Sequence, residues 1–200
     1  KRGHDFVRYA DDCNVYVRSR RAGDRVMSLL RRLYAGLHLR INESKSAVAK
    51  ATQRTFLGFA FWVASGKAVR LRVSPKALGA MKDRVRRIAR RTRGRSLSQI
   101  CVDLRSYLGS WNEYFRLAET PRVFSDLDEW IRHRLRAVQL KQWKRGRTVY
   151  RELRARGLSS LRAAQVAANA RSWWRNSAMA IHGALPNSLF ATLGVPRLGA

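Results

Sequence analysis

The sequence predicts an α+β fold in which short antiparallel hairpins and one helix come first and an all-helical half follows. Before residue 74, runs of β-favouring residues broken by turn residues stand on either side of one helical pattern, whereas apolar residues recur at helical spacing in most of the chain beyond it. The chain has 42 Lys and Arg against 13 Asp and Glu, a formal net charge of +29 at pH 7. Such an excess repels itself unless a polyanion neutralises it, so we expect nucleic acid as the partner.

The first hairpin is predicted from two short runs, residues 6–10 and 14–18, that are rich in Val, Tyr and Phe. Asp11 and Asp12 stand between these runs, and aspartate is a common turn residue. We therefore place two carboxylates at the tip of an antiparallel hairpin.

A helix over residues 22–37 follows, because its apolar side chains recur at helical spacing while its arginines fall on other faces. We expect this helix to cover a sheet. A second hairpin is predicted from residues 56–63 and 69–73, joined around residues 65–67. Gly58 lies inside the first of these runs, where glycine weakens a strand, so close approach of a backbone or ligand is the expected reason for it.

Ser74 and Pro75 mark the change to helix, since serine caps a helix N-terminus and proline suits the first helical position. The expected helices cover residues 76–92, 98–117, 124–144, 149–156 and 161–169. Short breaks between the first three predict a small antiparallel bundle. The predicted domains are residues 1–73, a helical domain over 74–156, and a helical extension over 157–200 that ends in a short irregular cap beyond residue 170.

Composition excludes several classes of protein. The hydrophobic fraction of 46% is too high for a solvated basic tail, so the chain should fold. No run reaches the roughly 18–20 apolar residues of a membrane span, and the start is no signal peptide, so we expect a cytoplasmic protein without a membrane partner. Cys13 and Cys101 offer neither a disulfide framework nor a zinc spacing.

The adjacent carboxylates of Asp11 and Asp12 are the sharpest functional signal. Two aspartates on a tight hairpin repel each other, and an exposed tip that bears both is explained if divalent cations bind there. In phosphoryl transfer, two such metals activate the attacking hydroxyl and neutralise charge on the leaving oxygen. Ordinary turn chemistry is the alternative interpretation of the bare dipeptide.

Three segments in order resemble known polymerase motifs. FVRYADD at residues 6–12 closely resembles motif C of reverse transcriptases, in the form typical of group II intron enzymes. Residues 22–46 are similar to motif D, in which a lysine is proposed to protonate the departing pyrophosphate, and Lys45 matches that lysine. FLGF at residues 56–59 resembles the primer-grip hairpin.

This resemblance implies an RNA-directed DNA polymerase, a nucleotidyltransferase that uses two Mg²⁺ ions, with residues 1–73 as the end of its palm. Its implied site residues are catalytic Asp11, Asp12 and Lys45, with both aspartates as metal ligands, and Tyr9, Leu57 and Gly58 against primer and template. An ordinary surface lysine is the alternative for Lys45, and a plain core strand is the alternative for residues 56–61.

Residues 74–156 resemble the maturase domain of these enzymes, which also serves as the basic polymerase thumb. YLGSWNEYF at residues 107–115 and WIRHRLR at residues 130–136 carry this resemblance. It implies binding of intron RNA in support of splicing and mobility. Arginine suits phosphate contacts, and few acidic residues are present to pair with it. The predicted RNA-binding residues are Arg84, Arg87, Arg91, Arg132 and Arg136, and solvated charged helix faces are the alternative.

The resemblance also implies parts that these residues do not supply. In the family, catalysis uses a further aspartate on an earlier palm strand and fingers that hold template and dNTP. With a chain that starts at Lys1, we expect no DNA polymerisation by this chain alone, and an N-terminal half as the partner that would complete it on an RNA/DNA primer-template. Two alternatives stay open, a stand-alone RNA-binding maturase without polymerase activity and a general basic nucleic-acid-binding protein.

Overall fold

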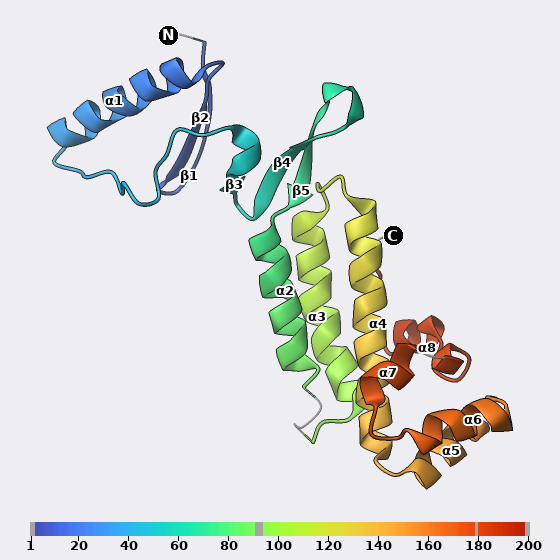
Figure 1. Ribbon diagram of the computed structural model, residues 1–200. Helices are drawn as coiled ribbons and strands as arrows, with labels where there is room; N and C mark the ends of the chain where they lie inside the picture. Colours follow the sequence, from blue (N-terminus) through green and yellow to red (C-terminus); the bar gives the residue numbers. More distant parts are fainter. Residues whose placement is uncertain (1–2, 91–93, 179, 199–200) are drawn as a thin grey trace. The chain divides into compact units, whose positions relative to one another are not determined.

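The computed structural model describes residues 3–90, 94–178 and 180–198 (Figure 1). The described residues form eight α-helices and two small antiparallel sheets, so the prediction of a mixed α and β chain is confirmed. The chain divides into two compact units, unit 1 over Lys1–Arg70 and unit 2 over Leu71–Ala200. The assignment of these units to a polymerase palm and thumb stays a prediction. No helix in the described part has the length and apolar character that a membrane span requires.

Unit 1 begins with the predicted hairpin. Strand β1 (Asp5–Tyr9) pairs antiparallel with β2 (Asp12–Tyr16), and the register closes with Tyr9 opposite Asp12. The prediction put both aspartates in the turn, but the pairing leaves residues 10 and 11 as the connection, with a φ of 51° at Ala10. Asp12 is therefore the first residue of β2. A two-residue connection of this kind is among the commonest in β-hairpins.

Helix α1 (Arg20–Gly36) begins after Ser19, whose Oγ accepts a hydrogen bond of 3.2 Å from the amide of Ala22. Gly23 is buried against Val48, since a Cβ at this glycine would lie 2.6 Å from Cγ1 of that valine. Much of the predicted apolar stripe is instead exposed, so the expectation that this helix covers a sheet is not met within unit 1. The exposed fractions along the stripe are 44% at Leu29, 56% at Leu33 and 65% at Leu37.

A three-stranded sheet follows, in the order β3 (Thr55–Phe56), β4 (Phe59–Val63) and β5 (Val69–Val73). The run predicted as one strand is broken, because Leu57 and Gly58 form a tight turn with φ values of 50° and 77°. Glycine adopts a positive φ without strain, and two-residue hairpin turns favour it for that reason. Gly58 thus has a conformational reason in the turn rather than inside a strand, and the expected close approach of a backbone or ligand stays a prediction.

Unit 2 is built on a bundle of three helices, α2 (Pro75–Ile88), α3 (Leu97–Phe115) and α4 (Pro121–Trp143). The chain runs down α2, up α3 and down α4, so the predicted antiparallel bundle is confirmed (Figure 1). Ser74 Oγ accepts a hydrogen bond of 3.2 Å from the amide of Ala77, as predicted for a helix cap. The apolar stripes meet in a core that includes Met81, Val85, Leu104, Leu108, Ile131 and Leu135.

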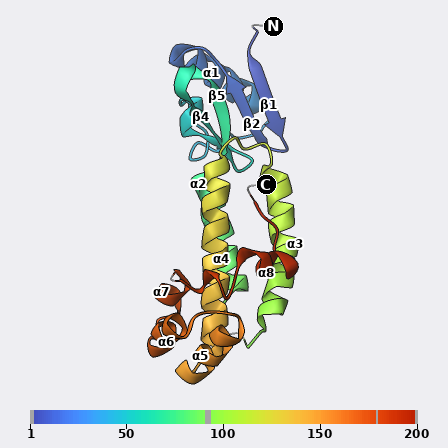
Figure 2. The same cartoon turned by 90° about the vertical axis from the view of Figure 1, so that its right-hand side faces the viewer.

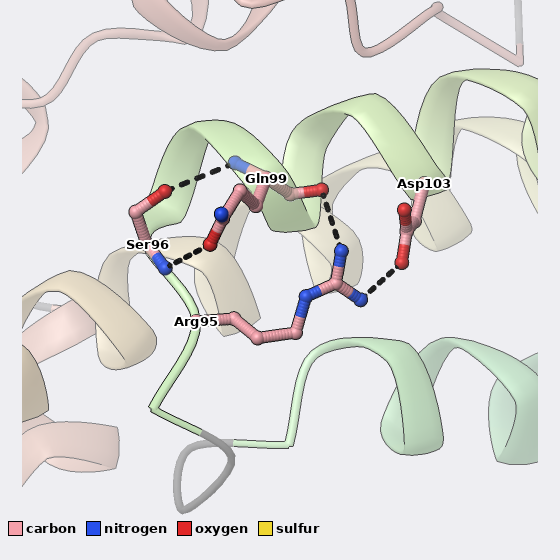
Figure 3. Close-up of polar contacts among 4 residues, drawn as sticks. All are labelled: Arg95, Ser96, Gln99 and Asp103. Atoms are coloured by element: carbon pink, nitrogen blue, oxygen red, sulfur yellow. Dashed lines mark hydrogen bonds and ion pairs between the residues drawn. The ribbon is translucent and has the colours of Figure 1, made fainter.

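Polar contacts fix the start of α3 (Figure 3). Ser96 Oγ accepts a hydrogen bond of 3.2 Å from the amide of Gln99, and Gln99 Oε1 accepts one of 2.9 Å from the amide of Ser96. This reciprocal capping box satisfies two backbone amides, those of Ser96 and Gln99, that have no acceptor within the helix. The guanidinium of Arg95 pairs with Asp103. The backbone carbonyl of Arg95 accepts a 2.7 Å hydrogen bond from the side chain of Gln142 on α4. The hydrogen bond from Gln142 joins the start of α3 to α4.

The C-terminal part of unit 2 is more helical than the irregular cap that the sequence predicts. Helices α5 (Gly146–Ala155) and α6 (Ser160–Ala168) pack against each other, and α7 (Trp173–Ala178) packs on α4 (Figure 2). A 3₁₀ helix (Ala180–His182) and α8 (Asn187–Thr192) follow. The segment from residue 180 to 198 returns along the bundle. Buried arginine side chains of α4 donate hydrogen bonds to its backbone carbonyls.

Candidate nucleic-acid interface

The acidic turn of unit 1 presents both predicted metal ligands to solvent. Asp11 and Asp12 are exposed, and Arg8 Nε donates a 2.9 Å hydrogen bond to the carbonyl of Ala10 beside them. Proteins commonly hold Mg²⁺ by one or two carboxylates together with waters and phosphates, so this pair suits part of such a site. Among the described residues, no group of three or more His, Cys, Asp or Glu could hold a metal. The pair alone does not complete the predicted two-metal site.

Lys45 lies on the loop that follows α1, and several contacts hold this loop in place. The Asn42 side chain accepts a 3.2 Å hydrogen bond from the amide of Lys45, and Arg54 donates to the Lys45 carbonyl at 2.7 Å. Arg31 on α1 donates two hydrogen bonds of 2.8 and 2.7 Å to Glu43, and these lower the pKa of the Glu43 carboxyl. The Lys45 side chain is exposed, and its catalytic role stays a prediction.

The residues predicted to contact primer and template lie at two hairpin turns of unit 1. Tyr9 pairs with Asp12 beside the acidic turn, and its side chain is 63% exposed. Leu57 and Gly58 form the turn between β3 and β4, where Leu57 is 37% exposed. Tyr9 and Leu57 are thus accessible, and contact of these residues with nucleic acid stays a prediction.

One basic face of unit 2 lies along the outside of α2. Arg84 and Arg87 are exposed there, and Arg90 just beyond the helix end is exposed too. Burial raises the pKa of Tyr107 on α3, and the positive charges of Arg84 and Arg87 oppose that rise. The face therefore carries two arginines whose charges act on Tyr107. Arg91, the third arginine predicted for this segment, lies outside the described residues.

A second basic group joins α2 to α4 around Trp130, which the sequence prediction left out of the site. The ring centroid of Trp130 lies 5.5 Å from Arg86 Cζ, 5.9 Å from Arg134 Cζ and 6.0 Å from Lys82 Nζ. Cations at this range are attracted to the face of an indole ring. Lys82 and Arg86 are four residues apart, as are Trp130 and Arg134, and this spacing was the signal that the prediction missed. We call these four residues the Trp130 cluster.

Arg132 and Arg136 have a different role from the RNA contact predicted for them, since both are 2% exposed. Arg132 donates to Asp128 Oδ1 at 2.8 Å and to the Pro196 carbonyl at 3.1 Å. Arg136 donates to the Leu185 carbonyl at 2.9 Å. Burial lowers the pKa of Arg136 to about 10, which leaves its guanidinium charged at neutral pH. Both arginines attach the C-terminal segment to α4, so we remove them from the predicted RNA-binding set.

By its fold and surface, unit 2 is a helical bundle that exposes arginine side chains. Residues 78–157, which run from α2 to just beyond α5, match the family model described as group II intron, maturase-specific domain. This match confirms the resemblance to a group II intron maturase that was recognised in the sequence. No curated protein matches the chain.

Proposed function

We propose that this chain is the RNA-binding part of a group II intron maturase, which holds intron RNA on unit 2 and assists its splicing. The observation that carries the proposal is that the maturase-specific match covers the helices that expose Arg84 and Arg87 and bear the Trp130 cluster. Arginine forks bind phosphate oxygens in pairs, and half-buried aromatic rings offer surfaces to unpaired bases. The net charge of +29 favours the same partner at the level of the whole chain.

The proposal predicts that the chain binds a folded group II intron RNA about tenfold or more tightly than duplex RNA of equal length, a difference of about 1.4 kcal/mol. Phosphate attraction alone would bind both RNAs with similarly steep salt dependence, because it responds to charge density rather than to shape. Fluorescence anisotropy at moderate salt measures both affinities. Equal affinities with equal salt slopes would favour the general nucleic-acid binder instead.

We infer further that unit 1 is the end of a reverse-transcriptase palm. The support is the resemblance of residues 6–12 to motif C, together with the small core of the unit. Among its described residues only Gly23 and Ala60 are buried, while Phe6 is 71% exposed and Val69 is 64% exposed. A unit that buries so little apolar surface is expected to pack against a further polypeptide. The N-terminal half of the complete polymerase, which would also bind dNTP and the primer-template, is the partner that we propose.

These 200 residues alone are expected not to extend a primer on an RNA template with Mg²⁺. Asp11 and Asp12 supply two carboxylates, fewer than a pair of catalytic metals needs. Extension should begin when a polypeptide with the fingers and the earlier palm strand is added, and Asp12→Asn should then abolish it. Asp24→Asn, at an exposed position of α1, is the matched control and should leave extension intact. Extension by the isolated chain would contradict the expectation.

A further inference from the structure

An open pocket of about 370 Å³ is lined by the end of α4 and by the segment that leads into α7. This volume is near the lower end of the roughly 300–1,000 Å³ that is usual for small-ligand sites. The lining residues are Lys141, Lys144, Arg171 and Trp173. Three of them are cationic and none is acidic. In the described part of the chain, no carboxylate pairs with any of the three cations, so the pocket is suited to an anion.

The backbone at Lys144 is strained. Its φ of 57° and ψ of −63° place it at the centre of a tight turn, closed by a 2.7 Å hydrogen bond from the amide of Arg145 to the carbonyl of Trp143. A γ-turn with positive φ is rare and unfavourable for a residue with a Cβ. Helices commonly end on a glycine, which would relieve the strain here. A lysine at this position is therefore best explained if its side chain binds a ligand.

The surroundings of Lys144 keep the strained turn in place. A Cβ on Gly146 would lie 2.7 Å from the carbonyl oxygen of Ala167, so the start of α5 is tightly packed against the end of α6. The same close packing brings the segment with Arg171 next to the end of α4, because Ala170 also lies beside Gly146. Strained conformations persist where packing fixes them in this way, and they occur preferentially at functional sites.

Trp173 supplies the aromatic wall of the pocket. Lys141 Nζ lies 3.8 Å from the centroid of its ring, so a positive charge already sits at the indole. A cation in the last turn of a helix is stabilised by the helix dipole, and that explains Lys141 without any ligand. It explains neither Arg171, which lies outside the helices, nor the strain at Lys144. An aromatic face beside several cations is the arrangement that binds single-stranded nucleic acid by base stacking and phosphate contact.

We propose that this pocket takes an unpaired nucleotide of RNA, with its base against Trp173 and its phosphate between Lys144 and Arg171. The inference rests on the proposed function and deepens it, because unpaired bases in loops and bulges distinguish a folded intron from plain duplex. The basic face of α2 would then supply phosphate contacts, while this pocket would recognise a feature of the RNA fold.

The test compares the affinity of the whole chain for an RNA duplex with one unpaired adenosine and for the same duplex fully paired. We expect a preference of about tenfold for the first, the usual size of one base stacked on an aromatic ring. The preference should vanish in Trp173→Ala and in the double variant Lys144→Gly/Arg171→Gln, and it should persist in Trp173→Phe. Because Trp173→Ala also removes packing of α7, the double variant decides the matter if Trp173→Ala fails to fold.

Lys144 offers a second measurement that is independent of RNA. The Lys144→Gly chain should melt about 2–4 °C above the Lys144→Ala chain, because only glycine relieves the positive φ. Equal melting would count against the argument from strain. A native chain without the preference, or a preference that survives in the folded double variant, would overturn the pocket assignment. If folded intron RNA were still preferred over duplex RNA in that case, the proposed function would stand without the pocket.

Discussion

The Asp128→Ala variant is expected to unfold with a free energy about 3 kcal/mol below that of the native chain. The side chains of Asp128 and Arg132 pair at 2.8 Å and are 15% and 3% exposed. Burial lowers the pKa of Arg132, and the negative charge of Asp128 opposes that shift. Without the carboxylate, the guanidinium stays buried with no compensating charge, which is the costly case for a buried pair. Asp128 also accepts a 3.0 Å hydrogen bond from the amide of Leu198, so the C-terminal segment loses an attachment.

Urea unfolding followed by tryptophan fluorescence measures this loss, because every tryptophan except Trp62 lies in unit 2. Asp126→Ala is the matched control, since Asp126 is exposed on the same helix, and it should change stability by about 0.5 kcal/mol or less. The double variant Asp128→Ala/Arg132→Met should recover part of the loss, because it removes the uncompensated charge. Equal effects of the two single variants would contradict the buried ion pair.

Sequence patterns predicted the elements whose signals act over a few neighbouring residues. The serine and proline at 74 and 75 marked the start of α2, and helical spacing placed α3 and α4 to within three residues at each end. Capping and apolar periodicity depend on residues at most one or two helical turns apart, so the sequence displays them directly. The exposure of Arg84 and Arg87 followed from the same periodicity.

The features that the sequence did not predict depend on contacts between distant segments or on strand register. Arg132 and Arg136 belong to a run of arginines that suggests a solvent-facing side. Their acceptors at Pro196 and Leu185 lie 64 and 49 positions further along the chain. No local sequence pattern indicates that the C-terminal segment comes back to α4. The turn at Gly58 depended on the pairing of Phe56 with Phe59, which splits a run that looks like one strand.

The sequence predicted only part of the candidate interface. The aromatic residues that it missed depend, like the buried arginines, on contacts between separate segments. Aromatic residues at helical spacing are most often core, so the four-residue spacing of Trp130 and Arg134 did not single these residues out. Trp173 carried no distinct signal in the sequence. The structure places cations from other elements beside both rings, Lys82 and Arg86 at Trp130 and Lys141 at Trp173. Such pairing joins separate helices, and only their packing reveals it.

The triple variant Arg84→Gln/Arg87→Gln/Arg90→Gln is expected to bind folded intron RNA about 100-fold more weakly at 0.15 M salt. The physical reason is release of counterions, which each phosphate contact drives and which salt opposes. If each arginine holds one phosphate, the slope of log affinity against log salt should become shallower by about three. All three side chains are exposed, and glutamine is nearly as good a helix former as arginine, so the fold should be kept.

A matched control distinguishes the effect of the α2 face on RNA affinity from the effect of net charge. Arg21→Gln/Arg25→Gln/Arg32→Gln removes the same charge from exposed positions of α1, outside the maturase-specific match. Long-range attraction is largely screened beyond about 8 Å at this salt concentration, so charges that touch no phosphate should matter far less than those that do. We expect the control to lose less than about tenfold in affinity and to keep most of the native salt slope. An equal loss in both triple variants would mean that total charge holds the RNA, and the α2 face would lose its assigned role.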